Sequence, residues 1–340
     1  MKRALLIILL AAVFHADLLA QQDPQFTHYM FNTLYYNPAF AGLDGNSKIT
    51  AIHRSQWLGY QPTVGGGGAP TTQIVSFSTP LYKVNSGIGA FIVNDKLGPQ
   101  SNLEAQATYS YSIQLRGGSM GKGSGKKITG GSSTYYAPSN GSRLSFGVKV
   151  GMYSQTVNFN LYRPIDPNDP VLKSEGKESQ VRPDLGFGAF YQDQKYYVGL
   201  SVNHLIKSEF DFGLSQRNAL EPHGYLTAGY FYDVNIDLRL QFSTLVKSDF
   251  TKTTFDVGGL AYYKDTMYGG LSFRQSEAAI LMLGYSLLKD KSLKLGYGLD
   301  YVIRDQDAKQ PTSHEFMLMY SLPVNPASGK KVVRTPRYRH

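Results

Sequence analysis

Residues 102–116 read NLEAQATYSYSIQLR, and polar and apolar side chains alternate along the whole stretch. The apolar set is Leu103, Ala105, Ala107, Tyr109, Tyr111, Ile113 and Leu115, and only polar residues stand between its members. Successive side chains of an extended strand point to opposite faces, so this stretch predicts a strand with one apolar and one polar face. It is also far longer than the usual globular strand of about 5–6 residues. Lipid on one side of a barrel wall and a wet lumen on the other would produce this pattern.

The same alternation recurs in 144–152, 236–242 and 293–303. Lys149, Arg239 and Asp300 fall in the polar rows of these stretches. A charged side chain near the middle of the lipid face would cost roughly 2–4 kcal/mol, whereas a wet lumen solvates it. The positions of the charges therefore favour the same interpretation as the apolar rows.

Between Ser47 and Leu322 the sequence holds about fourteen such segments, an even number, as single-chain bacterial barrels require. We predict strands at 47–57, 71–81, 86–95, 101–116, 143–155, 183–192, 194–205, 223–233, 235–247, 252–263, 265–274, 278–287, 292–304 and 313–322. The predicted fold is all-β, a transmembrane antiparallel β-barrel over 47–322 with an N-terminal plug-like segment. The sheet has to close into a barrel because closure pairs every backbone group in lipid. A secreted soluble β-sandwich also alternates and is the alternative, although its strands are usually shorter.

The connections between the predicted strands differ in length. Short polar joins stand at 192–194, 233–235, 264–265 and 289–291, while longer ones cover 117–142, 157–182 and 208–222. Barrels carry their long loops outside the cell, so we expect all three long connections on the outer side. The four glycines at 65–68 predict a flexible turn between the first two strands, since no Lys-Ser/Thr follows them as in a phosphate-binding loop.

The first twenty residues predict a cleaved secretory signal peptide. Lys2 and Arg3 precede an apolar run from Ala4 to Phe14, and a small residue, Ala20, stands before a polar stretch. The run is too short to span the bilayer, and no later run approaches the roughly 18 apolar residues of a spanning helix. The chain has no cysteine, which excludes a lipoprotein anchor, disulfides and zinc-thiolate chemistry.

Composition and charge favour an exported barrel with a basic end. The sequence holds 25 Tyr and 18 Phe with only 17% charged residues, a balance that suits an outer face and interfaces rich in aromatic residues. Part of the net charge of +9 gathers in a segment at 323–340, which carries Lys330, Lys331, Arg334, Arg337 and Arg339. We expect a periplasmic tail that is either a solvated end or a site for acidic protein, anionic lipid or cell wall, and no nucleic-acid partner.

The segment 21–46 is aperiodic but rich in large apolar side chains, namely Phe26, Tyr29, Met30, Phe31, Leu34, Tyr35, Tyr36 and Phe40. So many apolar groups would be a liability if exposed, so we expect the segment to dock inside the barrel or along its periplasmic mouth. Inward Tyr153, Phe190, Tyr197 and Tyr262 could fill the lumen together with it. Its role is either structural, as a plug or brace, or the binding of a partner.

No catalytic, cofactor or metal site is predicted. The seven histidines include no pair at i, i+2 or i, i+4 that would suit a metal. Ser313, His314 and Glu315 are neighbours on one strand, so His314 points away from the other two and the three cannot form a triad. The sequence also lacks a G-x-S-x-G elbow, and we expect a protein that is not an enzyme.

Two N-terminal motifs carry a resemblance to a known family. DPQFTHYMFN at 23–32 and YNPAFAG at 36–42 resemble the N-terminal signature of the PorP/SprF family of outer-membrane proteins of Bacteroidota, and HRSQW at 53–57, SVNHL at 201–205, YGGLSFR at 268–274 and RTPRY at 334–338 fit the same family. The residues that we single out as a partner-binding or structural motif are Gln25, Phe26, Tyr29, Met30, Asn32, Asn37, Pro38, Gly42, Arg54, Trp57 and Arg274.

The resemblance implies an outer-membrane component of the type IX secretion system and its linked gliding machinery. Such a protein would assist the export or surface attachment of specific proteins, such as adhesins, and contact periplasmic ring proteins of the secretion apparatus. Its partners would be outer-membrane lipid and these proteins, with no cofactor and no small-molecule substrate. The competing function is a general or substrate-specific porin, which would keep an open lumen with a charged constriction.

Overall fold

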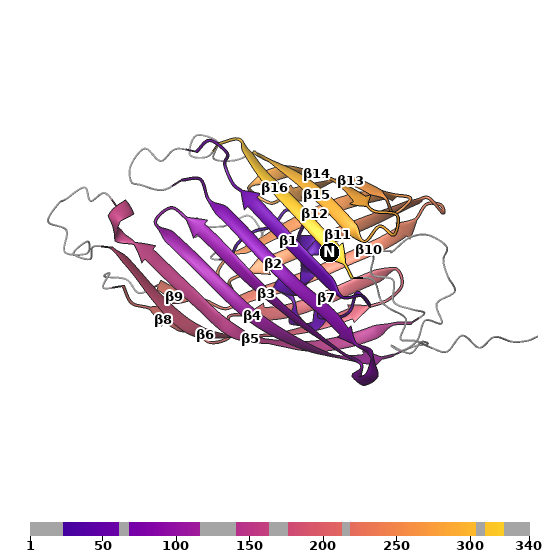
Figure 1. Cartoon of the computed structure of the whole chain (residues 1–340), viewed down its shortest axis with the longest axis horizontal. Coiled ribbons are helices and arrows are strands. Elements are labelled where there is room, and N and C mark those ends of the chain that lie inside the picture. The colour runs from indigo at the N-terminus through magenta and orange to yellow at the C-terminus, as the bar shows by residue number, and fades with distance from the viewer. Residues whose placement is uncertain are drawn as a thin grey trace, which may run out of the picture.

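The computed structural model describes residues 23–60, 68–115, 141–162, 176–212, 218–303 and 310–322. Within these residues fourteen strands form one closed antiparallel barrel (Figure 1). The predicted signal peptide, the basic tail at 323–340 and most of the glycine run at 65–68 lie outside the described residues. The predicted fold class is confirmed.

The barrel strands agree closely with the predicted ones. They are β1 (Lys48–Ser55), β2 (Thr71–Leu81), β3 (Ser86–Leu97), β4 (Gln100–Gln114), β5 (Arg143–Asn158), β6 (Lys177–Gln192), β7 (Tyr196–Asn203), β10 (His223–Asp233), β11 (Leu238–Ser248), β12 (Thr253–Tyr263), β13 (Met267–Arg274), β14 (Ala278–Leu287), β15 (Leu293–Val302) and β16 (Thr312–Ser321). Each pairs with the next along the chain, and β16 returns to pair with β1 over eight residue pairs. This closing pair removes the sheet edges.

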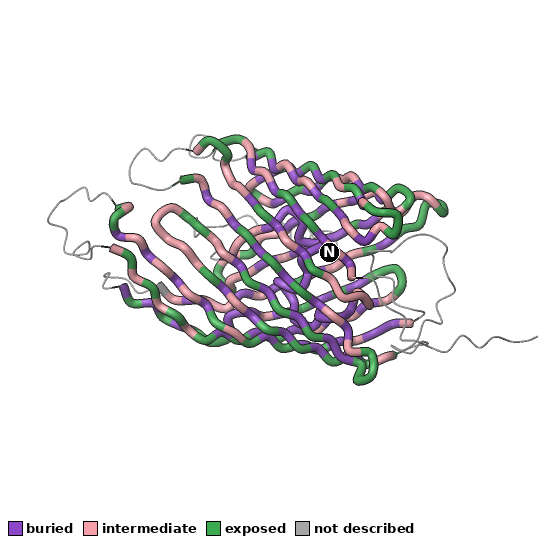
Figure 2. The backbone as a smooth tube through the Cα atoms, viewed as in Figure 1, coloured by how far each residue is buried: buried purple, intermediate pink, exposed green. Residues whose placement is uncertain are grey.

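The wall shows the alternation that the sequence predicts. On β4, Tyr109 and Tyr111 are exposed on the outer surface, whereas Ser110 and Ser112 between them are buried. Figure 2 shows the same alternation of buried and exposed positions along neighbouring strands. The inward aromatic residues are confirmed too, since Tyr153, Phe190, Tyr197 and Tyr262 are all buried.

Several strand ends differ from the predicted ones by one to three residues, and the start of β6 differs by six. Ile236 is fully exposed in the turn before β11, which begins only at Leu238. β6 begins at Lys177 instead of residue 183 and pairs with β5 as far as Asn158. The residues 177–182 are mostly polar and resemble a loop in sequence, because neither face of this part of the strand is buried.

The predicted loop at 208–222 contains a small sheet of its own. β8 (Ser208–Phe210) pairs with β9 (Asn218–Leu220). Phe210 and Leu220 form a second buried apolar cluster with residues of β5 and of the 3-10 helix η5 (Phe159–Leu161). The hairpin is therefore packed on one end of the wall. A further 3-10 helix, η4 (Tyr82–Val84), turns the chain between β2 and β3.

The three long connections do not share one end of the barrel. Because consecutive strands are antiparallel, the connections alternate between the two ends. The connection from β4 to β5 leaves from the end that also holds the start of β1 and the end of β16. The connections from β5 to β6 and from β7 to β10 leave from the opposite end. The expectation that all three lie outside the cell is therefore wrong, since strand order fixes the side of each.

Residues 23–43, here called the plug, lie inside the barrel. The plug contains η2 (Tyr29–Phe31), the one-turn helix α2 (Thr33–Tyr36) and η3 (Pro38–Phe40), and every residue of the three is buried. Its apolar residues belong to the same core cluster as inward residues of the wall. The main core of the molecule is thus the contact between the plug and the barrel wall.

Candidate functional site in the barrel lumen

The aromatic residues of the plug pack on inward aromatic residues of the wall. Tyr35 contacts Phe91 of β3 edge to face, with ring centroids 5.5 Å apart, and Phe40 contacts Phe190 of β6 at 5.4 Å. Phe31 lies against Tyr268 of β13, with centroids 5.1 Å apart. Such pairs add about 0.5–1.5 kcal/mol each beyond the burial of their area. Aromatic contacts thus join the plug to widely separated strands.

Glycines in the wall let the plug backbone approach closely. A Cβ atom at Gly147 of β5 would lie 2.3 Å from the Ala39 nitrogen, and one at Gly87 of β3 would lie 2.0 Å from the Ala41 carbonyl oxygen. Gly42 of the plug has a φ of +69° and would bring a Cβ to 2.8 Å from the Gly87 Cα. Only glycine fits such contacts.

Asn37 and Pro38 form the turn that enters η3. Pro38 stands at the start of the helix, where its missing N–H costs nothing, and the Asn37 side-chain oxygen accepts a hydrogen bond of 2.9 Å from the Ala39 N–H. The Asn37 amide nitrogen donates to the carbonyl oxygens of Ala189 and Leu200 on β6 and β7, at 3.0 and 3.1 Å. One side chain therefore caps the helix and fastens it to the wall.

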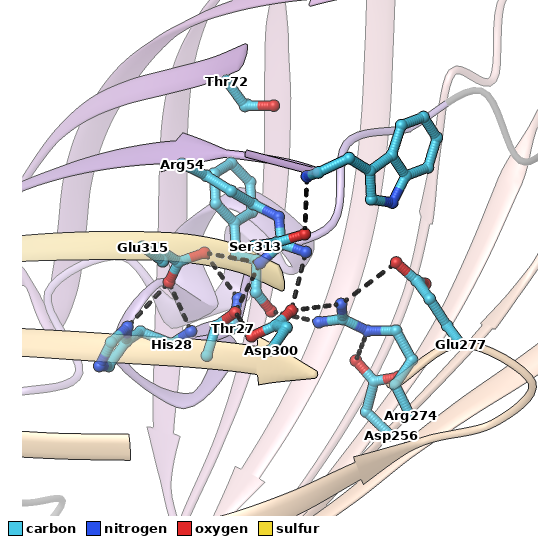
Figure 3. A network of polar contacts seen from close by, with 12 residues as sticks. Thr27, His28, Arg54, Thr72, Asp256, Arg274, Glu277, Asp300, Ser313 and Glu315 are labelled. Carbon is cyan, nitrogen blue, oxygen red and sulfur yellow. Dashed lines mark hydrogen bonds and ion pairs between the residues drawn. The ribbon is translucent and has the colours of Figure 1, made fainter. Parts of the chain in front are cut away.

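A network of buried charges, here called the arginine network, joins residues of β1, β12, β13 and β15 (Figure 3). Arg54 of β1 and Arg274 of β13 flank Asp300 of β15, with nitrogen to oxygen distances of 2.8 and 3.1 Å. Arg274 also pairs with Asp256 of β12 at 3.2 Å. All four side chains are at most 1% exposed. Buried charges are tolerated when they are paired in this way.

The start of the plug binds directly to this network. Glu315 of β16 accepts hydrogen bonds of 2.7 Å from the backbone N–H groups of Thr27 and His28. The Thr27 hydroxyl donates to Asp300 at 2.7 Å and accepts from Arg54 at 2.6 Å. Figure 3 shows Thr27 and His28 beside the Glu315 and Asp300 side chains. The plug backbone therefore completes the hydrogen bonding of the charged groups.

A second polar group, here called the histidine cluster, surrounds the first residue of the plug. His204 follows β7 and lies 3.1 Å from Asp23, and its other ring nitrogen lies 3.1 Å from Asp184 of β6. His223 begins β10 and pairs in register with Asn203, next to His204. The Tyr225 hydroxyl also donates to Asp23. Side chains from β10 and from the residue after β7 thus converge on one plug carboxylate.

The structure brings together most of the motif residues chosen from the sequence. Phe26 contacts the arginine network, since its carbonyl oxygen accepts a hydrogen bond of 3.1 Å from Arg274. The Tyr29 hydroxyl lies 3.0 Å from the Ser243 hydroxyl of β11, and Met30 and Asn32 are buried in the plug. Gln25 is partly buried at its start. A binding role for these residues stays a prediction.

Trp57 lies apart from the other motif residues. It follows β1 at the barrel end, has a φ of +50° and packs edge to face on Tyr60. Its backbone N–H donates to the Ser313 hydroxyl at 3.0 Å. The five basic residues of the predicted tail, from Lys330 to Arg339, lie outside the described residues.

Ser313, His314 and Glu315 take the alternating orientations that the sequence predicts. Ser313 and Glu315 are buried inside the barrel, and His314 lies 2.8 Å from the Tyr297 hydroxyl on the other face of the wall. The three do not form a triad. Sequence reasoning missed Thr27, His28 and Asp256, although Thr27 and His28 stand within the quoted N-terminal motif and Asp256 within an alternating strand.

No helix in the described parts of the chain is both long and apolar enough to span a bilayer. A closed antiparallel wall with an apolar outer face and a packed interior defines the class of outer-membrane β-barrels. Within that class, the family model described as type IX secretion system membrane protein PorP/SprF matches residues 18–320. The chain belongs to the PorP/SprF family and is a membrane component of the type IX secretion system in the outer membrane.

Several solved structures match most of the chain at low identity. A FadL homologue of Pseudomonas aeruginosa is 12% identical, with a TM-score of 0.43 over 84% of this chain and 92% of that chain. The toluene transporter TbuX of Ralstonia pickettii is 10% identical, with a TM-score of 0.47 over 86% and 93%. The outer membrane protein Omp33 of Acinetobacter baumannii is 4% identical, with a TM-score of 0.41 over 82% and 98%. The comparison with curated proteins found no match.

Proposed function

We propose that this chain is a plugged, non-enzymatic barrel that assists the export or surface attachment of specific proteins, such as adhesins, and contacts ring proteins of the secretion apparatus in the periplasm. The observation that carries the proposal is the plug. A barrel with a lumen occupied by a fixed segment of its own chain serves better as a docking component than as a route for solutes.

The plug is fixed at opposite points of the wall. Thr27 binds Asp300 of β15, and Asn37 binds the Ala189 carbonyl of β6. In the strand order of the closed barrel, β6 lies seven steps from β15 in either direction around the ring of fourteen. The plug therefore crosses the lumen along a diameter.

A porin requires the opposite arrangement. Its charged constriction has to face an open, water-filled path. Here Arg54, Arg274, Asp300 and Glu315 are at most 1% exposed and bind each other or the plug. These charges are used for structure, which favours a secretion accessory over a solute channel.

The basic segment that ends the chain supports contact with the periplasmic ring. Both the start of β1 and the end of β16 lie at one end of the barrel, and the five basic residues follow β16 in the sequence. A cationic segment that continues from that end offers an electrostatic docking site for an acidic partner. Because such attraction is screened, binding is expected to weaken as salt rises.

Co-purification from native membranes followed by mass spectrometry tests the proposal. We expect ring proteins, a surface adhesin, or both to be enriched with the tagged full-length chain. Replacement of Lys330, Lys331, Arg334, Arg337 and Arg339 by glutamine is expected to remove the ring proteins and to leave an adhesin bound. A matched control replaces exposed Lys195, Lys264 and Lys289, which stand in short turns at the same end of the barrel, by glutamine and is expected to leave both partners bound.

An unrelated outer-membrane barrel, tagged and solubilised in the same way, gives the background. If neither ring proteins nor a surface protein exceed that background, the proposed role is wrong. If the variant with five glutamines in the tail retains ring proteins as well as the natural chain does, the basic residues of the tail do not bind the ring proteins.

A further inference from the structure

The histidine cluster has the composition of a metal site. Asp23, His204 and His223 each offer one ligand atom, and these atoms all lie within 4.8 Å of one another. All three residues are at most 8% exposed. Two imidazoles and one carboxylate are a ligand set that Zn²⁺ accepts, with a fourth position left for water. Asp23 comes from the plug, and the two histidines come from the adjoining ends of β7 and β10. The three residues are far apart in the sequence, so their spacing does not reveal the site.

Each of the two rings has an oxygen atom close to its Nδ1 atom. The Nδ1 atom of His204 lies 3.1 Å from the Asp184 carboxylate, and the Nδ1 atom of His223 lies 2.8 Å from the Glu221 carbonyl oxygen. A proton on each Nδ1 leaves the Nε2 lone pair free, and a ligand histidine usually donates its other N–H to such an acceptor. The Nε2 atom of His204 already faces Asp23 at 3.1 Å.

The His223 ring carries an atom that an ion pair at His204 does not explain. A protonated His204 could bridge Asp23 and Asp184 without any metal. That arrangement leaves the Nε2 atom of His223, which is buried and has no hydrogen-bond partner. A buried polar atom without a hydrogen-bond partner is unfavourable. A cation between the three ligand atoms would give the Nε2 atom of His223 a partner.

We propose that Asp23, His204 and His223 bind one Zn²⁺ ion, which fastens the first residue of the plug to the barrel wall. Tetrahedral Zn²⁺ with bonds of about 2.0 Å holds its ligand atoms roughly 3.3 Å apart. The pair formed by His204 and Asp23 is already at 3.1 Å, and the ligand atom of His223, which lies within 4.8 Å of both, has to move inward to complete the site.

A second triplet around His204 is less suited to a metal. Glu104 and Asp184 also lie near His204. Glu104 pairs with Lys149 at 3.1 Å, and Asp184 accepts a hydrogen bond of 2.5 Å from Gln106. The charge of Glu104 is therefore already compensated, and Asp184 already accepts a hydrogen bond. In the proposed site Asp184 orients His204 and does not bind the ion.

The test uses the full-length barrel purified in detergent, stripped with a chelator and titrated with zinc chloride. We expect about one Zn²⁺ per chain by elemental analysis. When His204 and His223 are both replaced by glutamine, we expect the dissociation constant for Zn²⁺ to rise by about tenfold or more. The control variant His314→Gln alters a histidine on the outer face of the wall and is expected to bind zinc as the natural chain does. Mg²⁺, which prefers oxygen ligands, is not expected to compete.

Two further measurements keep the result independent of folding. The heat-dependent shift in electrophoretic mobility reports a folded barrel, and Asp23→Asn alters the plug without touching the wall. Cobalt substituted for zinc is expected to give visible absorption bands in the natural chain that are lost in Asp23→Asn. If the natural chain takes up no more zinc than the folded double variant, or if the cobalt spectrum of the Asp23→Asn variant equals that of the natural chain, the site does not exist.

Discussion

At the residue scale, the fit between plug and wall depends on single glycines that the sequence does not single out. Alternation places Gly147 on the inward face of β5, and this was predictable. The reason for a glycine there is the Ala39 backbone of the plug, at a distance that excludes any side chain. Periodicity shows which way a residue faces but not what it meets across the lumen, so this part of the site could not be predicted.

Gly147→Val is expected to displace η3 from the wall and to destabilise the folded barrel by about 1–3 kcal/mol, the range typical of overpacking. The free energy of unfolding in urea, measured in detergent, checks this. Gly259→Val is the control, because a Cβ there would meet Phe242 at an ordinary 3.6 Å. Equal stability of the two variants would contradict the proposed contact.

Buried charges at the same scale give a second prediction. Arg274→Met removes the partner of Asp256 and Asp300 and leaves two buried carboxylates less compensated. Breaking a buried pair costs about 3–5 kcal/mol, so we expect a large loss of stability in the same unfolding assay. Adding Asp300→Asn to this variant is expected to restore part of the loss.

Arg239→Met serves as the control for that series. Arg239 pairs with Asp233 near a turn, where both side chains are partly exposed, and such pairs contribute about 1 kcal/mol at most. If Arg239→Met costs as much as Arg274→Met, burial is not what makes the arginine network important.

At the element scale, strands were predictable and the plug only in part. Each strand carries its own signal, because lipid and lumen impose opposite demands on alternate residues, and the errors fall at ends such as 177–182, where that contrast is lost. The plug helices are three or four residues long, too short for a helical period to show. Their aromatic content predicted burial, but not the anchors at Glu315 and Asp300.

Removal of the plug tests its effect on the lumen. We expect deletion of residues 23–43, with residues 1–22 kept, to turn a barrel with little ionic current into one with large steady currents in planar bilayers. Deletion of 323–340 is the control and is expected to leave the current low. Large currents from the natural chain would contradict the plugged state and favour the porin.

At the scale of the whole molecule, strand order decides which connections share a face. One end carries the longer connections 56–70, 159–176 and 204–222, and the other carries mostly short turns together with the connection from β4 to β5. Single-chain barrels keep short turns in the periplasm, so we expect the first end to face outward. Loop length alone misled the sequence prediction because it ignores the parity of the strands.

Single cysteines can check this orientation, since the chain has none of its own. Thr251→Cys in the turn between β11 and β12 is expected to react with a membrane-impermeant maleimide on intact cells. Gln194→Cys, in the turn between β6 and β7 at the opposite end, is expected to react only after the outer membrane is permeabilised. The reverse result would invert the assigned orientation.

The pairing of Thr27 and His28 with Glu315 has a consequence for biogenesis. Glu315 stands on β16, the last strand to emerge, and β16 is also the strand that pairs with β1. Thr27 and His28 precede every barrel strand in the sequence, so they acquire these bonds only when the final hairpin has arrived. Closure of the barrel and docking of the plug are then coupled. A chaperone would have to shield the aromatic residues of the plug until the barrel closes.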